Sequence, residues 1–222
     1  MKFLQKVDLS KNKLTKLPQI ITPAIVNLNL DENEIAECDF NGHPNIKVLS
    51  LNKNKLASGA GLHSLAKLEE LSIQENETLT SLKGMDNMKS LKKLNLTGSK
   101  LESLDELPSF PCLEELILDG NAVANIDQLP KLGHLTSLRE LSMQGTPLAE
   151  EKGDDLKKEV LIALMDKLPR LKKVNGEGWD DELVKDAKET KEQRIQEAIE
   201  AAKAAEEAAK AAAENPEGGE EA

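Results

Sequence analysis

The sequence predicts an α/β solenoid: a curved coil of about seven repeats with a parallel β-sheet on its concave side, a helical carboxy-terminal cap and a long final helix. Three observations predict this fold class. The template L-x-x-L-x-L-x-x-N-x-L occurs seven times in phase within residues 1–150, and apolar residues recur at every third position between copies. Near Trp179 the composition then changes from nearly neutral to acidic and alanine-rich.

The repeats define the register of the expected strands. Their first positions are Leu4, Ile25, Ile46, Leu68, Leu91, Leu113 and Leu138. The L-x-L core of each copy predicts a short strand whose leucines face inward, because successive side chains of a strand point to opposite sides. One repeat is too small to bury its apolar face alone, so stacked repeats must share a core.

The asparagine of the template is expected to hydrogen-bond backbone groups where the chain turns inside the coil. Ser99 and Thr146 take its place in the fifth and seventh copies. Between strands, the period of three suits tight 3₁₀ turns, whose side chains align at i and i+3. We therefore expect short 3₁₀ or helical turns on the convex face.

Residues 151–178 are expected to cap the carboxy-terminal end of the coil. Within them, 154–168 has the apolar spacing of an amphipathic helix, with Asp154 and Asp155 as amino-terminal caps and Pro169 as the stop. A last strand-like turn should follow.

The opposite end has no such cap, so Phe3 and Leu4 are expected to lie at an exposed edge of the coil. Two interpretations remain open: a short polar turn suffices there, or a partner covers this edge.

Residues 179–214 predict a long helix that begins at an Asp180 cap, followed by a disordered acidic tail over 215–222. Ten of the 18 residues 196–213 are alanine, the best helix former. The helix carries a thin apolar stripe that could dock against another protein, or else it is a solvated spacer. The candidate docking residues are Val184, Ala187, Ile195, Ala198, Ala202, Ala205 and Ala209.

Composition argues against several classes of function. Residues 180–222 hold 14 of the chain's 40 acidic residues and 6 of its 29 basic ones, and the net charge is −11. Aromatic residues make up only 2% of the chain, so nucleic-acid binding has neither a basic face nor stacking side chains. No apolar run is long enough to span a membrane.

The sequence also lacks the patterns of catalysis. No Ser/His/Asp or Cys/His grouping, phosphate loop or metal-ligand spacing is present, so we expect no enzyme, cofactor, metal or small-molecule substrate. His43, His63 and His134 are interpreted as surface or capping residues. Cys38 and Cys112 are interpreted as small buried residues of a reducing compartment.

Protein binding is then the default function, and the concave face is its first candidate surface. Val48 and Ile117 are the apolar residues that strand alternation directs outward. The acidic candidates are Glu70, Glu115, Asp119 and Glu140. The alternative is a solvated concave face, with contacts made at the ends or by the helix.

The repeats resemble the 22-residue class of leucine-rich repeats found in a regulator of protein phosphatase 1. The ending GTPL…LPRLKKVNG is similar to the cap of that class, which is shared with spliceosomal and acidic nuclear leucine-rich proteins. Over roughly 79–200, MKSLKKLNLTGS, NAVANIDQLPKLGHLTSLRELSM and WDDELVKDAKETKEQRIQEA resemble the leucine-rich repeat-containing protein 23 family of ciliary radial-spoke components.

That resemblance implies a structural subunit of a ciliary or flagellar axoneme, such as the radial spoke, with other subunits of the assembly as partners. The expected location is cytoplasmic and cytoskeletal, in the axoneme. Two alternatives remain: a regulatory subunit of a protein phosphatase, and a nuclear or spliceosomal acidic adaptor.

Overall fold

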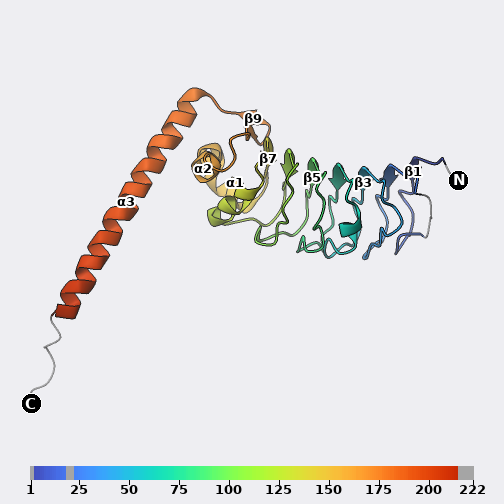
Figure 1. Ribbon diagram of the computed structural model, residues 1–222, viewed down its shortest axis with the longest axis horizontal. Helices are drawn as coiled ribbons and strands as arrows, with labels where there is room; N and C mark the ends of the chain where they lie inside the picture. Colours follow the sequence, from blue (N-terminus) through green and yellow to red (C-terminus); the bar gives the residue numbers. More distant parts are fainter. Residues whose placement is uncertain (1–2, 19–22, 215–222) are drawn as a thin grey trace, which may run out of the picture. The chain divides into compact units, whose positions relative to one another are not determined.

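The computed structural model describes residues 3–18 and 23–214, with side chains through residue 210. The expected tail over 215–222 lies outside the described residues. One nine-stranded sheet runs through the structure in chain order, from β1 to β9 (Figure 1). Its first eight strands are parallel and its last pair is antiparallel. The seven repeat strands are β1 (Lys6–Asp8), β2 (Asn27–Asn29), β3 (Val48–Ser50), β4 (Glu70–Ser72), β5 (Lys93–Asn95), β6 (Glu115–Ile117) and β7 (Glu140–Ser142).

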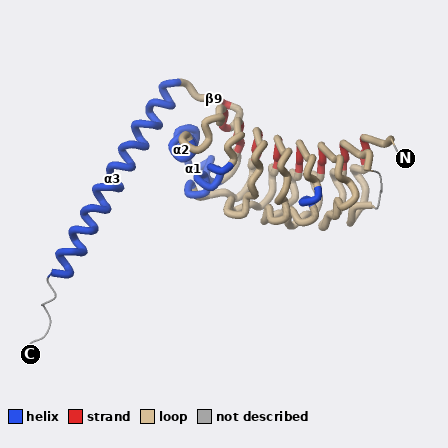
Figure 2. The backbone as a smooth tube through the Cα atoms, in the orientation of Figure 1, coloured by secondary structure: helices blue, strands red, loops and turns tan. Residues whose placement is uncertain are grey.

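The predicted register is confirmed. Each strand pairs with the next so that its central residue lies beside the central residue of its neighbour, as Leu71 lies beside Leu49 and Leu94. These central side chains are buried from β2 onward. Figure 2 shows the short strands following one another along one side of the coil, with loops forming the remainder of each turn.

The template asparagines link neighbouring repeats through the backbone. The Asn54 Nδ2 group donates to the carbonyl oxygens of Leu30 (3.0 Å) and Leu51 (3.1 Å), and its Oδ1 accepts from the Ile35 amide (3.0 Å). Equivalent bonds are made by Asn33, Asn76 and Asn121. Each of these side chains therefore satisfies backbone groups of its own repeat and of the preceding repeat, as expected for buried polar atoms.

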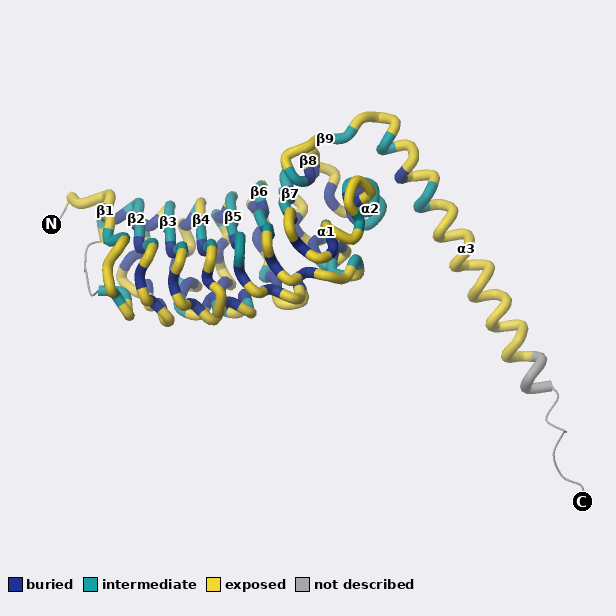
Figure 3. Tube along the Cα trace, turned by 180° about the vertical axis from the view of Figure 1, so that it is seen from behind, coloured by how far each residue is buried: buried dark blue, intermediate teal, exposed yellow. Residues whose placement is uncertain are grey.

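In the part of the convex side that the structure describes, turns alternate with two 3₁₀ helices, η1 (Leu62–Ser64) and η2 (Ile126–His134). The residues that recur at every third position there are buried, as in the series Leu101, Leu104, Leu107, Phe110 and Leu113. Figure 3 shows this continuous interior, with buried segments in the turns that follow the first repeat, whose described residues are exposed or half-buried. The stacked repeats therefore share one core.

The cap differs from the single predicted helix over 154–168. It contains α1 (Pro147–Lys152), η3 (Gly153–Asp155) and α2 (Leu156–Leu164). Helix α1 begins inside the range assigned to the last repeat, because the Thr146 hydroxyl accepts a hydrogen bond from the Ala149 amide and Pro147 occupies the first turn.

Two expected helix boundaries in the cap are wrong. Asp155 precedes α2 in helical conformation and makes no side-chain capping bond, because the chain enters α2 directly from η3. At the other end, α2 stops at Leu164, five residues before Pro169. The apolar face of α2 still covers the end of the core, because its residues Leu156, Val160, Leu161 and Leu164 are buried.

The last strand-like turn is a hairpin of β8 (Lys173–Val174) and β9 (Glu177–Gly178). Strand β8 extends the parallel sheet beside β7, and β9 returns antiparallel to β8. Asn175 and Gly176 between them both have positive φ, of 54° and 81°, which is the conformation that a two-residue hairpin turn requires. The Asn175 Oδ1 also accepts a bond from the Met143 amide (2.9 Å), so the turn is fastened to the preceding repeat.

The chain divides into two compact units, residues 1–179 and 180–222. The second unit contains α3 (Asp181–Glu214), which begins where the Asp180 carboxylate accepts a hydrogen bond from the Leu183 amide (2.8 Å). A long helix at this place is what the sequence predicts.

Candidate protein interface

The concave face consists of three columns of side chains that run across the strands. The first column is Lys6, Asn27, Val48, Glu70, Lys93, Glu115, Glu140 and Lys173. The second is Asp8, Asn29, Ser50, Ser72, Asn95, Ile117 and Ser142. The third column lies just beyond the strand ends and includes Asp31, Asn52, Gln74 and Asp119. The structure thus brings all six predicted concave residues to one face.

The four predicted acidic residues, Glu70, Glu115, Asp119 and Glu140, form an acidic strip along the concave face. Most of them form hydrogen bonds or ion pairs with neighbouring residues. The Lys93 Nζ lies 2.7 Å from a Glu115 carboxylate oxygen, and the Lys173 Nζ lies 3.8 Å from Glu140. Asp119 accepts hydrogen bonds from the Ser142 hydroxyl (2.7 Å) and the Gln144 amide (2.8 Å). Within the described part of the chain, Glu70 is the strip residue whose carboxylate has no hydrogen bond or ion pair, and it is exposed.

The polar third column serves the fold more than recognition. Asp31 accepts bonds from the Ser50 hydroxyl and the Asn52 amide, and Asn52 accepts the equivalent bonds from Ser72 and Gln74. These side chains satisfy each other and the backbone at the strand ends. Binding through this column would have to break bonds that hold the repeats together.

The amino-terminal end of the concave face is hollowed. A shallow groove of about 390 Å³ is lined by residues of the first three strands, including Lys6, Asp8, Asn29, Asp31 and Val48. Val48 is half-buried at its margin. The groove has cationic, anionic and apolar walls, which suits a peptide segment better than a single charged ligand.

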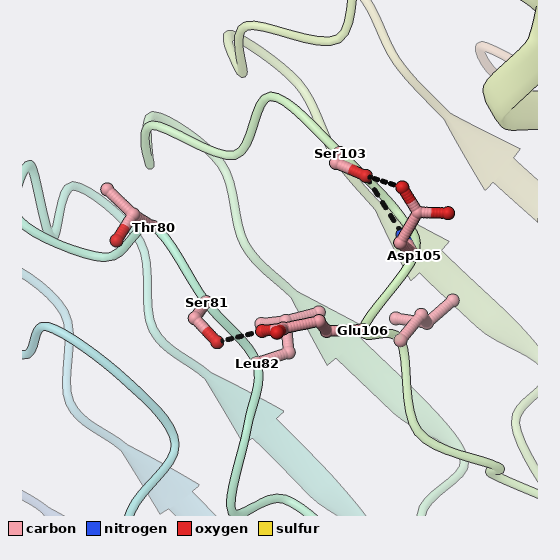
Figure 4. A pocket seen from close by; sticks show the side chains of 7 residues that line it. Thr80, Ser81, Leu82, Ser103, Asp105 and Glu106 are labelled. Carbon is pink, nitrogen blue, oxygen red and sulfur yellow. Dashed lines mark hydrogen bonds between the residues drawn. The ribbon is translucent and has the colours of Figure 1, made fainter.

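A second hollow lies between the connections of the fourth and fifth repeats and has a volume of about 370 Å³. Figure 4 shows that its polar side chains are turned toward one another: the Ser81 hydroxyl donates to Glu106, and Ser103 donates to Asp105. Asp105 also pairs with Lys131. The hydrogen bond from Lys131, and after it the bond from Ser103, lowers the pKa of Asp105. The polar side chains Ser81, Ser103, Asp105 and Glu106 already bond protein groups, so this hollow is a weak candidate.

Exposed ion pairs also run along the flank of the sheet. Hydrogen bonds from Lys47 and Lys92, each 2.7 Å long, lower the pKa of Glu69 to about 2. Charge pairs of this kind contribute little to stability because water screens them. They do hold Lys47, Glu69 and Lys92 in alternating charge order on the surface beside the strands.

The docking stripe of α3 is only partly available. Ala187 is fully buried and Val184 is half-buried, so Ala187 must be removed from the candidate surface. Ile195 is 51% exposed, and the four remaining stripe alanines are exposed. Sequence reasoning missed Ile199, which is 43% exposed and lies one turn from Ile195. The four-residue spacing of these isoleucines was the available signal.

Two expectations about histidine and cysteine need correction. His43 is buried rather than at the surface, because the turn after Phe40 folds it inward, and its Nδ1 lacks a partner among the described atoms. Cys112 is exposed rather than buried, because it begins the turn that leads to β6. Cys38 is buried, as expected, and burial raises the pKa of its thiol to about 12.

Within the described residues, no group of three or more His, Cys, Asp or Glu side chains is placed to hold a metal ion. The helices described also include none that combines the length and the apolar character needed to cross a bilayer.

Comparison with solved structures identifies the fold. An internalin of Listeria monocytogenes, InlF, superposes on 83% of this chain with a TM-score of 0.54 and 19% identity, over 64% of its own chain. Internalin C2 of the same organism matches 75% of the chain with a TM-score of 0.59, 19% identity and 68% of its own chain. The leucine-rich repeat domain of the type III effector XopL matches 61% with a TM-score of 0.51 and 20% identity, over 50% of that chain. This protein has the leucine-rich repeat fold.

Sequence relatives point to the same class of repeat. An uncharacterized leucine-rich repeat-containing protein of Schizosaccharomyces pombe is 35% identical over 81 residues, which are 34% of this chain and 13% of that protein. Keratocan of Danio rerio is 30% identical over 108 residues, which are 46% of this chain and 30% of that protein. The chain thus spans less than a third of either relative. No protein-family model matches it.

Proposed function

We propose that this leucine-rich repeat protein is a non-catalytic scaffold that binds an extended segment of another protein on its concave face. The observation that carries the proposal is the arrangement of Val48, Glu70 and Ile117 on strands β3, β4 and β6. Glu70 is an uncompensated charge between two half-buried apolar side chains. Protein interfaces have an apolar core with polar and charged side chains at its rim, so Val48 and Ile117 would serve as apolar contacts and Glu70 as a rim charge.

The spacing of these residues constrains the partner. Val48 and Ile117 are separated by three strand-to-strand steps, roughly 14 Å, and by two residues along the strand direction, roughly 7 Å, which together give about 16 Å. An extended peptide covers that distance in about five residues at about 3.4 Å each. The partner segment therefore needs two apolar side chains about five residues apart, with a Lys or Arg between them to reach Glu70.

Helix α3 provides the second proposed contact. Ile195 and Ile199 form an exposed apolar pair on α3, whose sequence is rich in Ala, Glu and Lys. Alanine buries little area, so the stripe alone would bind weakly. Two weak contacts on one chain strengthen each other, because the first raises the effective concentration of the second.

The finer proposal is that the assembly is a ciliary or flagellar axoneme, with radial-spoke subunits as partners. Its support is the resemblance of residues 79–200 to a family of radial-spoke components. The scaffold proposal does not depend on which assembly the partner belongs to, so the two levels of the proposal can be tested separately.

The test of the scaffold proposal is crosslinking of the tagged protein in cells, followed by identification of crosslinked peptides by mass spectrometry. We expect crosslinks from Lys93, beside Glu70, to one partner protein. Val48→Asp and Ile117→Asp should abolish them. Ala124→Asp is the matched control, because it places the same charge at an exposed position outside the three columns. Equal crosslinking by all three variants would refute the concave site.

The test of the finer proposal is fractionation of a ciliated cell that expresses the tagged chain. Retention on the detergent-extracted axoneme would support the axonemal assignment. Recovery in the soluble or nuclear fraction would refute that assignment and leave the scaffold proposal to the crosslinking result.

A further inference from the structure

Among the described residues, strand β1 at the amino-terminal edge of the solenoid pairs on one side only, with β2. On β1, the odd-numbered backbone groups bond β2: the Gln5 carbonyl accepts from Val26 and Asn27, and the Leu9 amide donates to Asn29. Backbone groups alternate in direction along a strand, so those of Lys6 and Asp8 point away from β2. Both residues are exposed. Unpaired edges of this kind are templates for pairing with another strand.

The core beneath this edge is incompletely covered. Val7, Leu9, Leu14 and Leu17 are only partly buried, whereas the equivalent side chains of later repeats are almost fully buried. Phe3 is 91% exposed and Leu4 is 39% exposed just before β1. The edge therefore offers both unpaired backbone groups and apolar surface.

The charges of β1 are self-complementary in one register. In an antiparallel pair centred on Val7, Lys6 of one copy lies opposite Asp8 of the other, and two-fold symmetry repeats this contact. Lys6 and Asp8 are the residues whose backbone groups face outward, so they form the hydrogen-bonded pairs of this register. Val7 then faces Val7 at the closer, non-hydrogen-bonded position.

We propose that β1 pairs with β1 of a second copy of this chain, in antiparallel register about Val7, and joins two solenoids through one continuous sheet. Cross-strand pairs of opposite charge favour this register, and slips that place Lys6 opposite Lys6 or Asp8 opposite Asp8 are disfavoured. The pairing ends after Asp8, because the Asp8 carboxylate accepts the Ser10 amide in a turn. Phe3 and Leu4 of each copy lie beside the interface and add apolar contact.

The test is the mass of the full chain measured by light scattering during gel filtration over a wide range of concentrations. We expect a monomer–dimer equilibrium. Lys6→Glu places acidic residues opposite each other, and Asp8→Lys places lysines opposite each other, so each variant alone should be monomeric. An equimolar mixture of the two should form a heterodimer, because every cross-strand pair is then of opposite charge. The double variant Lys6→Glu/Asp8→Lys should dimerise like the original chain.

Any other pattern overturns the proposal. A chain that stays monomeric up to its solubility limit has no such interface, and dimers that persist in both single variants use another surface. Thermal melting of each variant checks that it is folded.

A second measurement does not depend on charge reversal. In a Cys112→Ser background, Val7→Cys should form a disulfide-linked dimer under mild oxidation, because the two residues face each other at the symmetry axis. Lys6→Cys should crosslink far less, because its partner is residue 8. Equal crosslinking of both would refute the register. None of these outcomes depends on the concave site.

Discussion

The solenoid and helix α3 are stabilised in opposite ways. In the solenoid, strands of three residues are held only by their neighbours, and the leucines of every repeat enter a common core. In α3, the hydrogen bonds are local, and every described side chain from residue 192 to 210 is exposed. The comparison teaches that the first unit depends on long-range packing, whereas the second depends on intrinsic helix propensity.

The largest expected difference between the two units is their response to an added aspartate. Leu118→Asp puts an unpaired carboxylate at a side chain with 0% exposure, which should cost about 4 kcal/mol or more and unfold the solenoid. Ala202→Asp, on the exposed surface of α3, should change stability by less than about 1 kcal/mol. Thermal melting followed by circular dichroism measures both, and an unchanged melt for Leu118→Asp would contradict the register.

An intermediate effect is expected from the asparagine bonds. Asn121→Ala removes a side chain that bonds Leu96, Leu118 and Leu101, and leaves buried backbone groups unsatisfied. We expect a loss of about 2–4 kcal/mol in urea unfolding. Asn12→Ala is the matched control, because Asn12 holds the same template position but is exposed, and its loss should stay within about 0.5 kcal/mol. Equal losses would show that burial does not govern these bonds.

The smallest effect should be confined to α3. Ala205→Gly replaces an exposed alanine in the helix and should weaken it by about 1 kcal/mol. Hydrogen exchange should become faster around residue 205, while protection of the solenoid amides and its melting temperature stay unchanged. A shift in the solenoid melt would mean that the two units fold as one.

The periodic parts of the fold were predictable from the sequence, and the local exceptions were not. The spacing of the L-x-L cores predicts every strand from β1 to β7, because one inward leucine determines which neighbours face outward. The cap is divided into α1, η3 and α2 because Thr146 caps the start of α1 and Gly153, with positive φ, ends it. The spacing of apolar residues alone does not predict this division.

The sequence predicted which residues lie on the concave face, but the pairing of their charges was not identified from it. The column that contains Glu70 and Glu115 also contains Lys93 between them, so the ion pair of Lys93 with Glu115 could have been expected from alignment of the repeats. The burial of His43 had no comparable signal, because it arises from an irregular connection.

The asparagine bonds affect how cooperatively the solenoid unfolds. Each buried asparagine bonds its own repeat and the repeat before it. In a solenoid, cooperative unfolding depends on the interaction energy between neighbouring repeats. Ser99 makes no such link, since its buried hydroxyl has no partner among the described atoms, and the Thr146 hydroxyl bonds only the Met143 carbonyl and the Ala149 amide of its own repeat. The fifth and seventh repeats are therefore joined to the repeats before them by backbone bonds and core packing without the side-chain link. We expect these two junctions to open first when the coil unfolds partially.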